Sequence, residues 1–306
     1  MMQLNYVSKK TPISRSNVFI IFLFLVQLFF NCILFNHPLF IASNYAIILI
    51  IAISNRIART LTVYVKMGLL FGLFILIFSI LLNPNGETIL IETNLDLPLY
   101  GDIIITLETV INSLLSAFSL VSLVMVFGLM NKIINPDGLT RIFAKLKLPY
   151  SINFMIMASI RFFPLLVEDL QRITDVQKSR GFELEGRNFL VKIKNQIVLI
   201  LPLLTNSLDR SIQMAEALES RGFGIKQKRT TYNPIHFRKT SYLSIMLTML
   251  SIAVSIVFFI QGYVTFNPYP LFGGFGFDSP LLVLFAAHLG LQTVNYLLIY
   301  MEGRFL

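Results

Sequence analysis

The sequence predicts an all-α polytopic membrane protein with about six transmembrane helices and one helical domain on the cytoplasmic side. Composition, the spacing of apolar segments and the distribution of charge support this fold class. Apolar residues make up 55% of the 306 residues before the sixteen glycines are counted, against about 45–50% with glycine in soluble domains. Charged residues make up 13%, roughly half the soluble average of 25%. A soluble fold of this length has too few charges to cover so much apolar surface.

Six apolar segments are long enough, or nearly so, to cross a bilayer, which takes about 20 residues. They cover residues 18–35, 39–54, 67–82, 103–130, 242–264 and 280–301. The first follows basic residues as a signal peptide does, but no small-residue cleavage site follows it, so we expect an uncleaved span. Two further apolar stretches, 152–160 and 197–204, are too short to span, and we expect helices packed against the cytoplasmic side of the bundle.

The charge of the connecting segments predicts the orientation of the chain. The loop at 83–102 carries four acidic and no basic residues. Residues 131–240 hold 18 of the 25 basic and 9 of the 16 acidic residues, so the whole net charge of +9 lies there. We therefore expect both termini in the cytoplasm, N-terminal transmembrane helices at 1–130, a basic cytoplasmic insert at 131–240 and C-terminal transmembrane helices at 241–306.

The insert contains an internal repeat. Residues 164–166 recur as residues 202–204, and Ser179-Arg180-Gly181-Phe182 recurs as Ser220-Arg221-Gly222-Phe223. Between these two parts of each copy, apolar residues at helical spacing predict an amphipathic helix. We expect Pro164 and Pro202 to lie in the first turn of the two helices, where the missing N–H costs nothing.

Each Ser-Arg-Gly-Phe motif has two compatible interpretations. The first is a helix C-cap, in which glycine takes the left-handed conformation, arginine complements the helix dipole and phenylalanine makes an apolar contact. The second is a docking site, because an arginine beside a glycine is suited to bind a partner's carboxylate or carbonyl through its planar fork. A cap has no need of arginine at the same place twice, which favours the docking role, and the cap would aim the arginine.

The repeated motif, together with Leu148-Pro149, Arg161-Phe162-Phe163-Pro164 and Arg229-Thr230, resembles the transmembrane T component of energy-coupling factor (ECF) transporters, the family that includes the cobalt-transporter membrane subunit. The resemblance covers about residues 15–265. Members carry two Ala-Arg-Gly-type motifs at the ends of cytoplasmic coupling helices, and serine stands here in place of the usual alanine. The chain also continues through an apolar segment after residue 265, longer than the family pattern.

This resemblance implies a transmembrane energy-coupling subunit of an ATP-driven uptake transporter for a vitamin or a metal ion, in the plasma membrane of a prokaryote. The 131–240 insert would be its cytoplasmic coupling domain. Two cytoplasmic P-loop ATPase subunits would dock at the coupling helices, and a separate substrate-binding (S) subunit would lie in the membrane. The residues implied in ATPase docking are Ser179, Arg180, Gly181, Ser220, Arg221 and Gly222.

The chain itself lacks a Gly-x-x-x-x-Gly-Lys-Ser/Thr loop, so ATP hydrolysis is expected on partner subunits. We expect no enzyme activity, no cofactor and no metal site on this chain. The alternative is a stand-alone secondary transporter or channel, which needs ionisable residues within the spans for coupling. The predicted spans contain only two candidates, Glu108 and His288, which are too few for a persuasive proton or ion path. An intramembrane enzyme would need a catalytic constellation that the sequence lacks. Nucleic-acid binding is not expected, because attraction to anionic lipid headgroups accounts for the juxtamembrane basic cluster at Lys226, Lys228, Arg229, Arg238 and Lys239.

Two polar stripes lie within predicted spans. His288, Gln292 and Asn295 share one face of the last span, where they are suited either to contact a substrate or to bond with neighbouring helices. Ser113, Ser116, Ser119 and Ser122 form a small-residue face, which favours close packing within the bundle or against a partner subunit. The sequence leaves both choices open.

Overall fold

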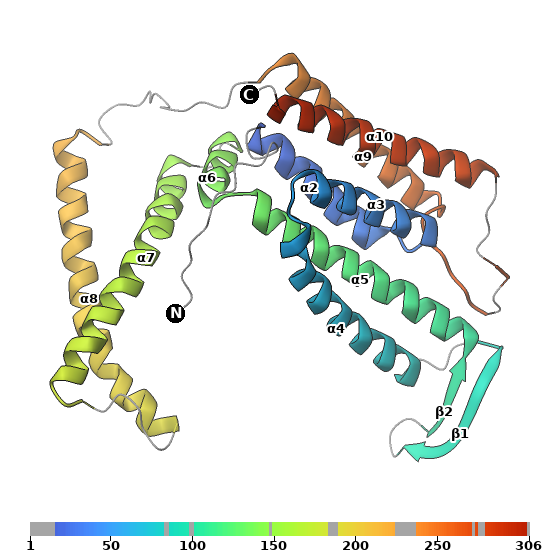
Figure 1. Cartoon of the computed structure of the whole chain (residues 1–306), viewed down its shortest axis with the longest axis horizontal. Helices are drawn as coiled ribbons and strands as arrows, with labels where there is room; N and C mark the ends of the chain where they lie inside the picture. The colour runs from blue at the N-terminus through green and yellow to red at the C-terminus, as the bar shows by residue number, and fades with distance from the viewer. Residues whose placement is uncertain are drawn as a thin grey trace. The chain divides into compact units, whose positions relative to one another are not determined.

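The computed structural model describes residues 16–82, 86–97, 101–146, 149–182, 189–223, 237–270, 273–274 and 279–304. Within these ranges the chain forms helices and one antiparallel strand pair (Figure 1). The elements are α2 (Val18–Leu34), α3 (Pro38–Ser54), α4 (Ala58–Leu82), β1 (Ile89–Leu97), β2 (Gly101–Thr106), α5 (Leu107–Ile133), α6 (Pro136–Lys145), α7 (Tyr150–Ser179), α8 (Phe189–Ser220), α9 (Lys239–Ile260) and α10 (Ser279–Arg304). They divide into two compact units, which we term the bundle unit (Met1–Ile142 with Ile235–Leu306) and the insert unit (Phe143–Pro234).

The six predicted spans correspond to α2, α3, α4, α5, α9 and α10, and three of their boundaries were wrong by four residues or more, since α9 ends at Ile260 rather than at residue 264 and the starts of α4 and α5 also differ. Helix α4 begins at Ala58 rather than at residue 67, because no glycine or proline interrupts residues 58–67. Helix α5 begins at Leu107 rather than at residue 103, since residues 101–106 pair with β1 as a strand. The hydroxyl of Thr106 then accepts from the backbone N–H of Thr109 and caps the helix.

The number of spans stays a prediction. By length and composition, five helices of the described chain are able to cross a membrane, namely α4, α5, α7, α9 and α10. Helices α2 and α3 have 17 residues each, about 26 Å at 1.5 Å per residue, slightly less than the ~30 Å hydrocarbon core. The count of six includes α2 and α3 and assigns α7 to the cytoplasm.

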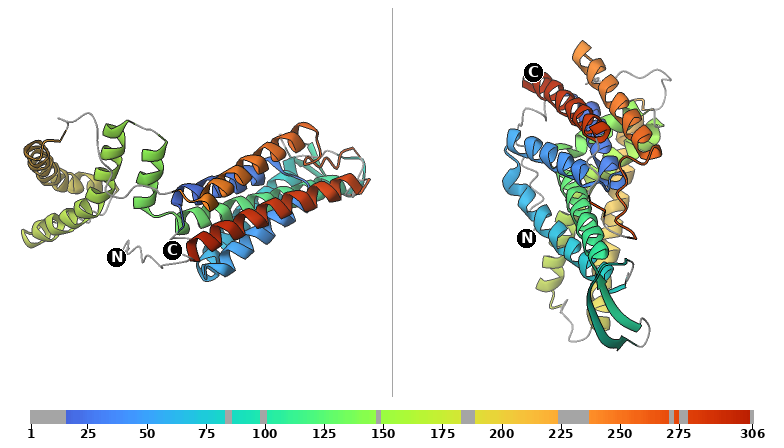
Figure 2. Two further views of the ribbon diagram at one scale, coloured as in Figure 1. Left: turned by 90° about the horizontal axis from the view of Figure 1, so that it is seen from above. Right: turned by 90° about the vertical axis from the view of Figure 1, so that its right-hand side faces the viewer.

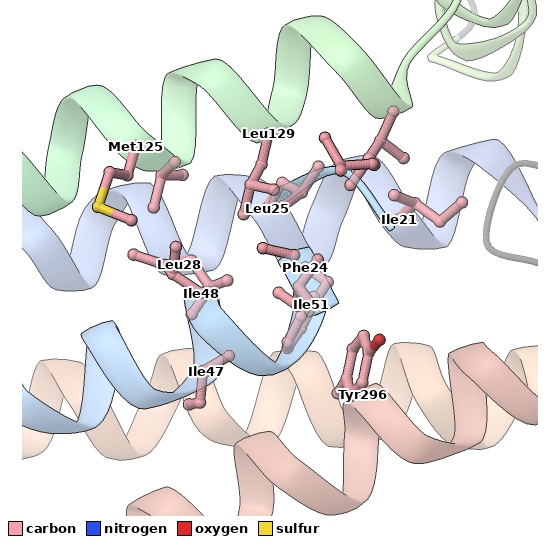
Figure 3. Close-up of a cluster of buried hydrophobic side chains, with 14 of the residues drawn as sticks. Ile21, Phe24, Leu25, Leu28, Ile47, Ile48, Ile51, Met125, Leu129 and Tyr296 are labelled. Carbon is pink, nitrogen blue, oxygen red and sulfur yellow. The ribbon is translucent and has the colours of Figure 1, made fainter. Parts of the chain in front are cut away.

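The core of the bundle unit lies where α2, α3, α5 and α10 meet (Figure 3). Phe24 and Leu28 of α2 contribute to it with Ile51 of α3, Leu129 of α5 and Tyr296 of α10, and each of these side chains is at most 3% exposed. Helix α9 packs on α2 and α10, while α4 packs mainly on α5 (Figure 2). The apolar segments of the sequence are therefore held together by side chains from four or more helices.

Close packing of α4 on α5 depends on glycines. A Cβ atom at Gly68 would lie 3.2 Å from the Cα of Val121, and one at Gly128 would lie 2.5 Å from the ring of Tyr64. Small residues let transmembrane helices approach closely without a hydrophobic driving force. Helix α4 otherwise exposes apolar side chains along much of its length, as a lipid-facing helix does.

An antiparallel β-hairpin occupies much of the predicted acidic loop, a feature that the sequence analysis did not predict. Glu108, in the first turn of α5, anchors it: the fully buried carboxylate accepts from the hydroxyl of Thr88 at 2.5 Å and from the Thr88 N–H at 3.4 Å. Gly86 lies so close that a Cβ atom there would be 2.5 Å from the same carboxylate. Glu108 therefore holds the hairpin through a buried carboxylate.

The insert unit contains the helix pair α7 and α8, which have 30 and 32 residues. The apolar stretches 152–160 and 197–204 are parts of these two long helices. Pro164 and Pro202 lie inside them, so the expectation that these prolines begin the helices was wrong. A proline removes one intrahelical hydrogen bond locally, and several turns of regular helix on both sides keep each helix continuous.

Candidate functional site

Both Ser-Arg-Gly-Phe motifs form the same C-terminal cap. Gly181 and Gly222 have φ values of 82° and 70°, the left-handed region that glycine adopts without strain. After α7, the Phe182 N–H donates to the Gln177 carbonyl at 3.1 Å and the Gly181 N–H to the Lys178 carbonyl at 3.0 Å. This pair of bonds is the Schellman motif.

The end of α8 repeats the pattern. The Phe223 N–H donates to the Leu218 carbonyl at 2.9 Å, and the Gly222 N–H donates to the Glu219 carbonyl at 2.8 Å. The left-handed glycine and the backbone hydrogen bonds of the predicted cap are thus confirmed at both motifs. Each arginine occupies the Ccap position, at the last point where the backbone still follows the helix.

Both arginine side chains are accessible on the insert unit. Arg180 and Arg221 are exposed, as are Ser179 and Ser220, whose hydroxyls bond back to carbonyls of their own helices. A Cβ atom at Gly181 would meet nothing within 4 Å. The cap therefore fixes the backbone below each arginine and leaves the guanidinium accessible, which is the geometry that bidentate binding of a partner's carboxylate or carbonyl requires.

The two motifs lie at opposite ends of one antiparallel helix pair (Figure 1). Arg210 of α8 forms a salt bridge with Asp169 of α7, at 2.8 Å, which aligns the middle of the pair. The ring of Phe223 lies 5.6 Å from Tyr150, where α7 begins. Because α7 has 30 residues, the Arg221 end and the Arg180 end are separated by about 45 Å along that helix.

Large apolar side chains cover much of the insert unit's exterior. None of α7 except Gln177 is fully buried. The exposed apolar residues on the described parts of the two helices are Ile152, Met155, Ile160, Phe163, Leu165, Val167, Leu170, Val176, Ile197, Ile200, Leu201, Leu204, Leu208 and Ile212. So many exposed large apolar side chains on two helices favour an interaction with a protein or a membrane.

The polar stripe of the last span lies inside the bundle unit. His288, Gln292 and Asn295 are at most 1% exposed. The Nε2 atom of His288 lies 2.7 Å from the amide nitrogen of Gln292 and 3.4 Å from that of Asn31 on α2, where it is placed to accept from both amides. Of the two choices that the sequence left open, the structure shows the bonding of neighbouring helices.

Sequence reasoning missed the partners of this stripe. Gln27 and Asn31, the two amide residues of α2, are spaced i, i+4 and so share one helix face. Asn31 bonds to His288, and the amide of Gln27 donates to the hydroxyl of Ser251 on α9. The signal was present in the sequence, because two amides in an otherwise apolar run indicate a helix face that needs polar neighbours.

The serine face of α5 packs within the bundle. Ser113 bonds to Ser79 of α4 at 2.8 Å, and the hydroxyl of Ser119 donates to the Cys32 carbonyl of α2 at 2.6 Å.

Among the described residues, no group of three His, Cys, Asp or Glu side chains is placed to hold a metal ion. Leu148, Lys226, Lys228 and the Arg229-Thr230 pair lie outside the described residues.

Comparison with known proteins supports the resemblance. The model of the cobalt transport protein family (CbiQ) matches residues 9–232. The energy-coupling factor transporter transmembrane protein EcfT of Staphylococcus aureus is 31% identical over 262 residues, which are 81% of this chain and 91% of that protein. Proteins of the same name from Macrococcus caseolyticus and Lactococcus lactis are 27% and 29% identical over 70% and 59% of this chain, and over 83% and 68% of their own lengths.

The family match covers the repeated helices and both Arg-Gly ends described above. It stops before α9 and α10, so the polar residues of α10 lie beyond the matched region, while their partner Asn31 on α2 lies within it. The extent of the family match and the identity to the Staphylococcus aureus protein together show that this chain belongs to the cobalt transport protein family, the family of the ECF transmembrane components that its paired motifs resemble.

Proposed function

We propose that this chain is the energy-coupling subunit of an ATP-driven ECF-type uptake transporter for a vitamin or a metal ion, and that Arg180 and Arg221 each dock one cytoplasmic ATPase subunit. One observation carries the proposal: the same capped helix end, with the same exposed arginine, occurs at both ends of a single helix pair. A helix needs a cap at its end, but the cap bonds use the backbone alone and leave both guanidinium groups for a partner.

The spacing of the two ends supports two ATPases rather than one. The ends are about 45 Å apart along α7, a distance greater than the contact width of one standard protein interface. One rigid helix pair that contacts two ATPase subunits would move as they close on each other. The salt bridge between Asp169 and Arg210 ties the two helices, so a displacement at one end is passed to the other.

The exposed apolar side chains of α7 and α8 support contact with a substrate-binding membrane subunit. In our proposal residues 131–240 form a cytoplasmic coupling domain between membrane helices at 1–130 and 241–306, with both chain termini inside. On the cytoplasmic side, a strongly apolar helix surface is unfavourable in water unless another protein or the membrane covers it. A second membrane protein has apolar surface of its own with which to do so. ATP hydrolysis then takes place on the docked subunits, since this chain carries no P-loop.

Alanine substitutions test the docking role. Arg180→Ala or Arg221→Ala removes a charge-assisted contact worth about 1.5–3 kcal/mol, so each should weaken co-purification of the ATPases by roughly ten-fold or more. The double substitution should abolish ATP-driven uptake while membrane insertion is unchanged. Arg172→Ala is the matched control, because Arg172 is also an exposed arginine of α7 but lies two turns before the motif. Wild-type uptake by the double variant would reduce both motifs to helix caps.

A further inference from the structure

The two capped ends differ in what happens to the phenylalanine that follows each glycine. The ring of Phe223 lies 4.9 Å from the ring of Phe154 and 5.6 Å from that of Tyr150, so it packs against the beginning of α7. Phe182 follows the same backbone geometry at the other end and is 50% exposed, against 38% for Phe223. Within the described chain, Phe182 has no ring contact of this kind.

The sequence explains the difference. In a Schellman motif the residue after the glycine usually packs on an apolar side chain at the third helical position from the end. That position is Leu218 in the second copy and Gln177 in the first. In addition, Tyr150 and Phe154 lie beside the Arg221 end, whereas the Arg180 end is at the far end of α7. Phe182 therefore has neither an apolar residue at that helical position nor the aromatic partners that Phe223 packs against.

We propose that Phe182 is an apolar anchor for the ATPase that docks at Arg180, and that Phe223 instead stabilises the insert unit. This inference rests on the proposed function and makes the two docking ends unequal. The partner at the Arg180 end would offer an acidic group or carbonyl for the guanidinium and, beside it, an apolar pocket for the ring. Aromatic residues and arginine are enriched in the buried core of protein interfaces. Here exposed Arg180 and exposed Phe182 flank the same glycine, Gly181.

The same surface offers no support for a purely local role of the ring. A Cβ atom at Gly181 would have open space around it, and Arg180 and Ser179 on the helix side are exposed. Burial of a phenylalanine side chain in a partner contributes about ten-fold or more to a dissociation constant. Because only one end gains this affinity, the two docking sites differ. Two non-identical ATPase subunits would therefore each bind at one particular end.

A pair of alanine substitutions separates the two phenylalanines. Phe182→Ala should weaken ATPase co-purification at least five-fold without lowering the thermal midpoint of the detergent-solubilised chain, and Phe182→Leu should restore most of the binding. Phe223→Ala should lower the thermal midpoint instead. If Phe182→Ala binds ATPases like wild type while Arg180→Ala does not, the anchor is refuted and the docking role stands. If neither substitution weakens binding, the docking role proposed for Arg180 fails with it.

Fluorescence identifies what covers the ring. The chain contains no tryptophan, so Phe182→Trp introduces a single reporter. In lipid nanodiscs its emission should shift to shorter wavelength when tryptophan-free variants of the purified ATPases are added, and Phe223→Trp should not respond. Emission at 182 that is already shifted in nanodiscs without ATPase would show that lipid covers the ring and would overturn the proposal.

Discussion

The bundle unit and the insert unit place their side chains in opposite ways. In the bundle, polar residues such as His288 and Gln292 are buried and apolar residues of α4 face outward. Helix α5 buries eleven residues, whereas α7, slightly longer, buries one. In a bilayer an outward apolar face has lipid as its solvent. The insert unit has a similar apolar exterior, and in our proposal, which places it in the cytoplasm, partner proteins cover that surface.

Topology is the strongest test of this comparison, because our proposal places the two units in different surroundings. Single cysteines at Glu92 of β1 and Glu216 of α8, in a Cys32→Ser background, should label only from outside and only from inside the cell, respectively. Both positions are exposed, and Cys32, the one native cysteine, is buried. Labelling of both positions from the same side would contradict the proposed orientation.

Removal of one buried polar partner should weaken the bundle strongly. His288→Leu leaves the amides of Asn31 and Gln292 without their acceptor, a loss of about 1–3 kcal/mol of stability. Asn31→Leu in the same chain should recover part of it, since an apolar pair needs no hydrogen bond. Thermal unfolding in detergent measures both. Ser159→Ala, an exposed hydroxyl of α7 bonded only within its helix, is the insert control and should change little.

These contacts mark the limit of what the sequence predicts. The glycine caps follow from local chemistry, because a left-handed residue after a helix favours glycine whatever surrounds it. The same Ser-Arg-Gly-Phe motif also occurs twice in the sequence. The pairing of Asn31 with His288 joins residues at the two ends of the chain, and the partner of a polar face is decided only when helices pack. Residues 103–106 of β2 were assigned to a span because their isoleucines suit a strand and a helix equally well.

The different fates of Phe182 and Phe223 show the same limit within the insert. The four-residue motifs are identical, so no local rule separates them. Antiparallel pairing of α7 and α8 brings Tyr150 and Phe154 to one motif only. Long helices with internal proline were also missed, because a proline indicates a helix start only when the preceding residues do not themselves continue the helix.

A smaller effect sharpens the role of the caps. Gly181→Ala should cost about 1 kcal/mol, since φ is 82° and no neighbouring atom is within reach of the new methyl group. Gly181→Asn should cost less, because asparagine tolerates this region better. Gly290→Ala provides the bundle control: Gly290 lies inside α10 with open space around it, so alanine there should be neutral or stabilising. Equal destabilisation at 181 and 290 would contradict the cap geometry.

The most direct measurement of the central claim is ATPase co-purification with the double variant Arg180→Lys, Arg221→Lys. Lysine keeps the positive charge and its favourable interaction with the helix dipole, but it lacks the planar fork for bidentate contact. If the arginines dock ATPases, as we propose, the variant should insert and fold like wild type and bind the ATPases several-fold more weakly at equal salt. Binding indistinguishable from wild type would contradict the docking geometry and leave the two arginines as helix-end charges.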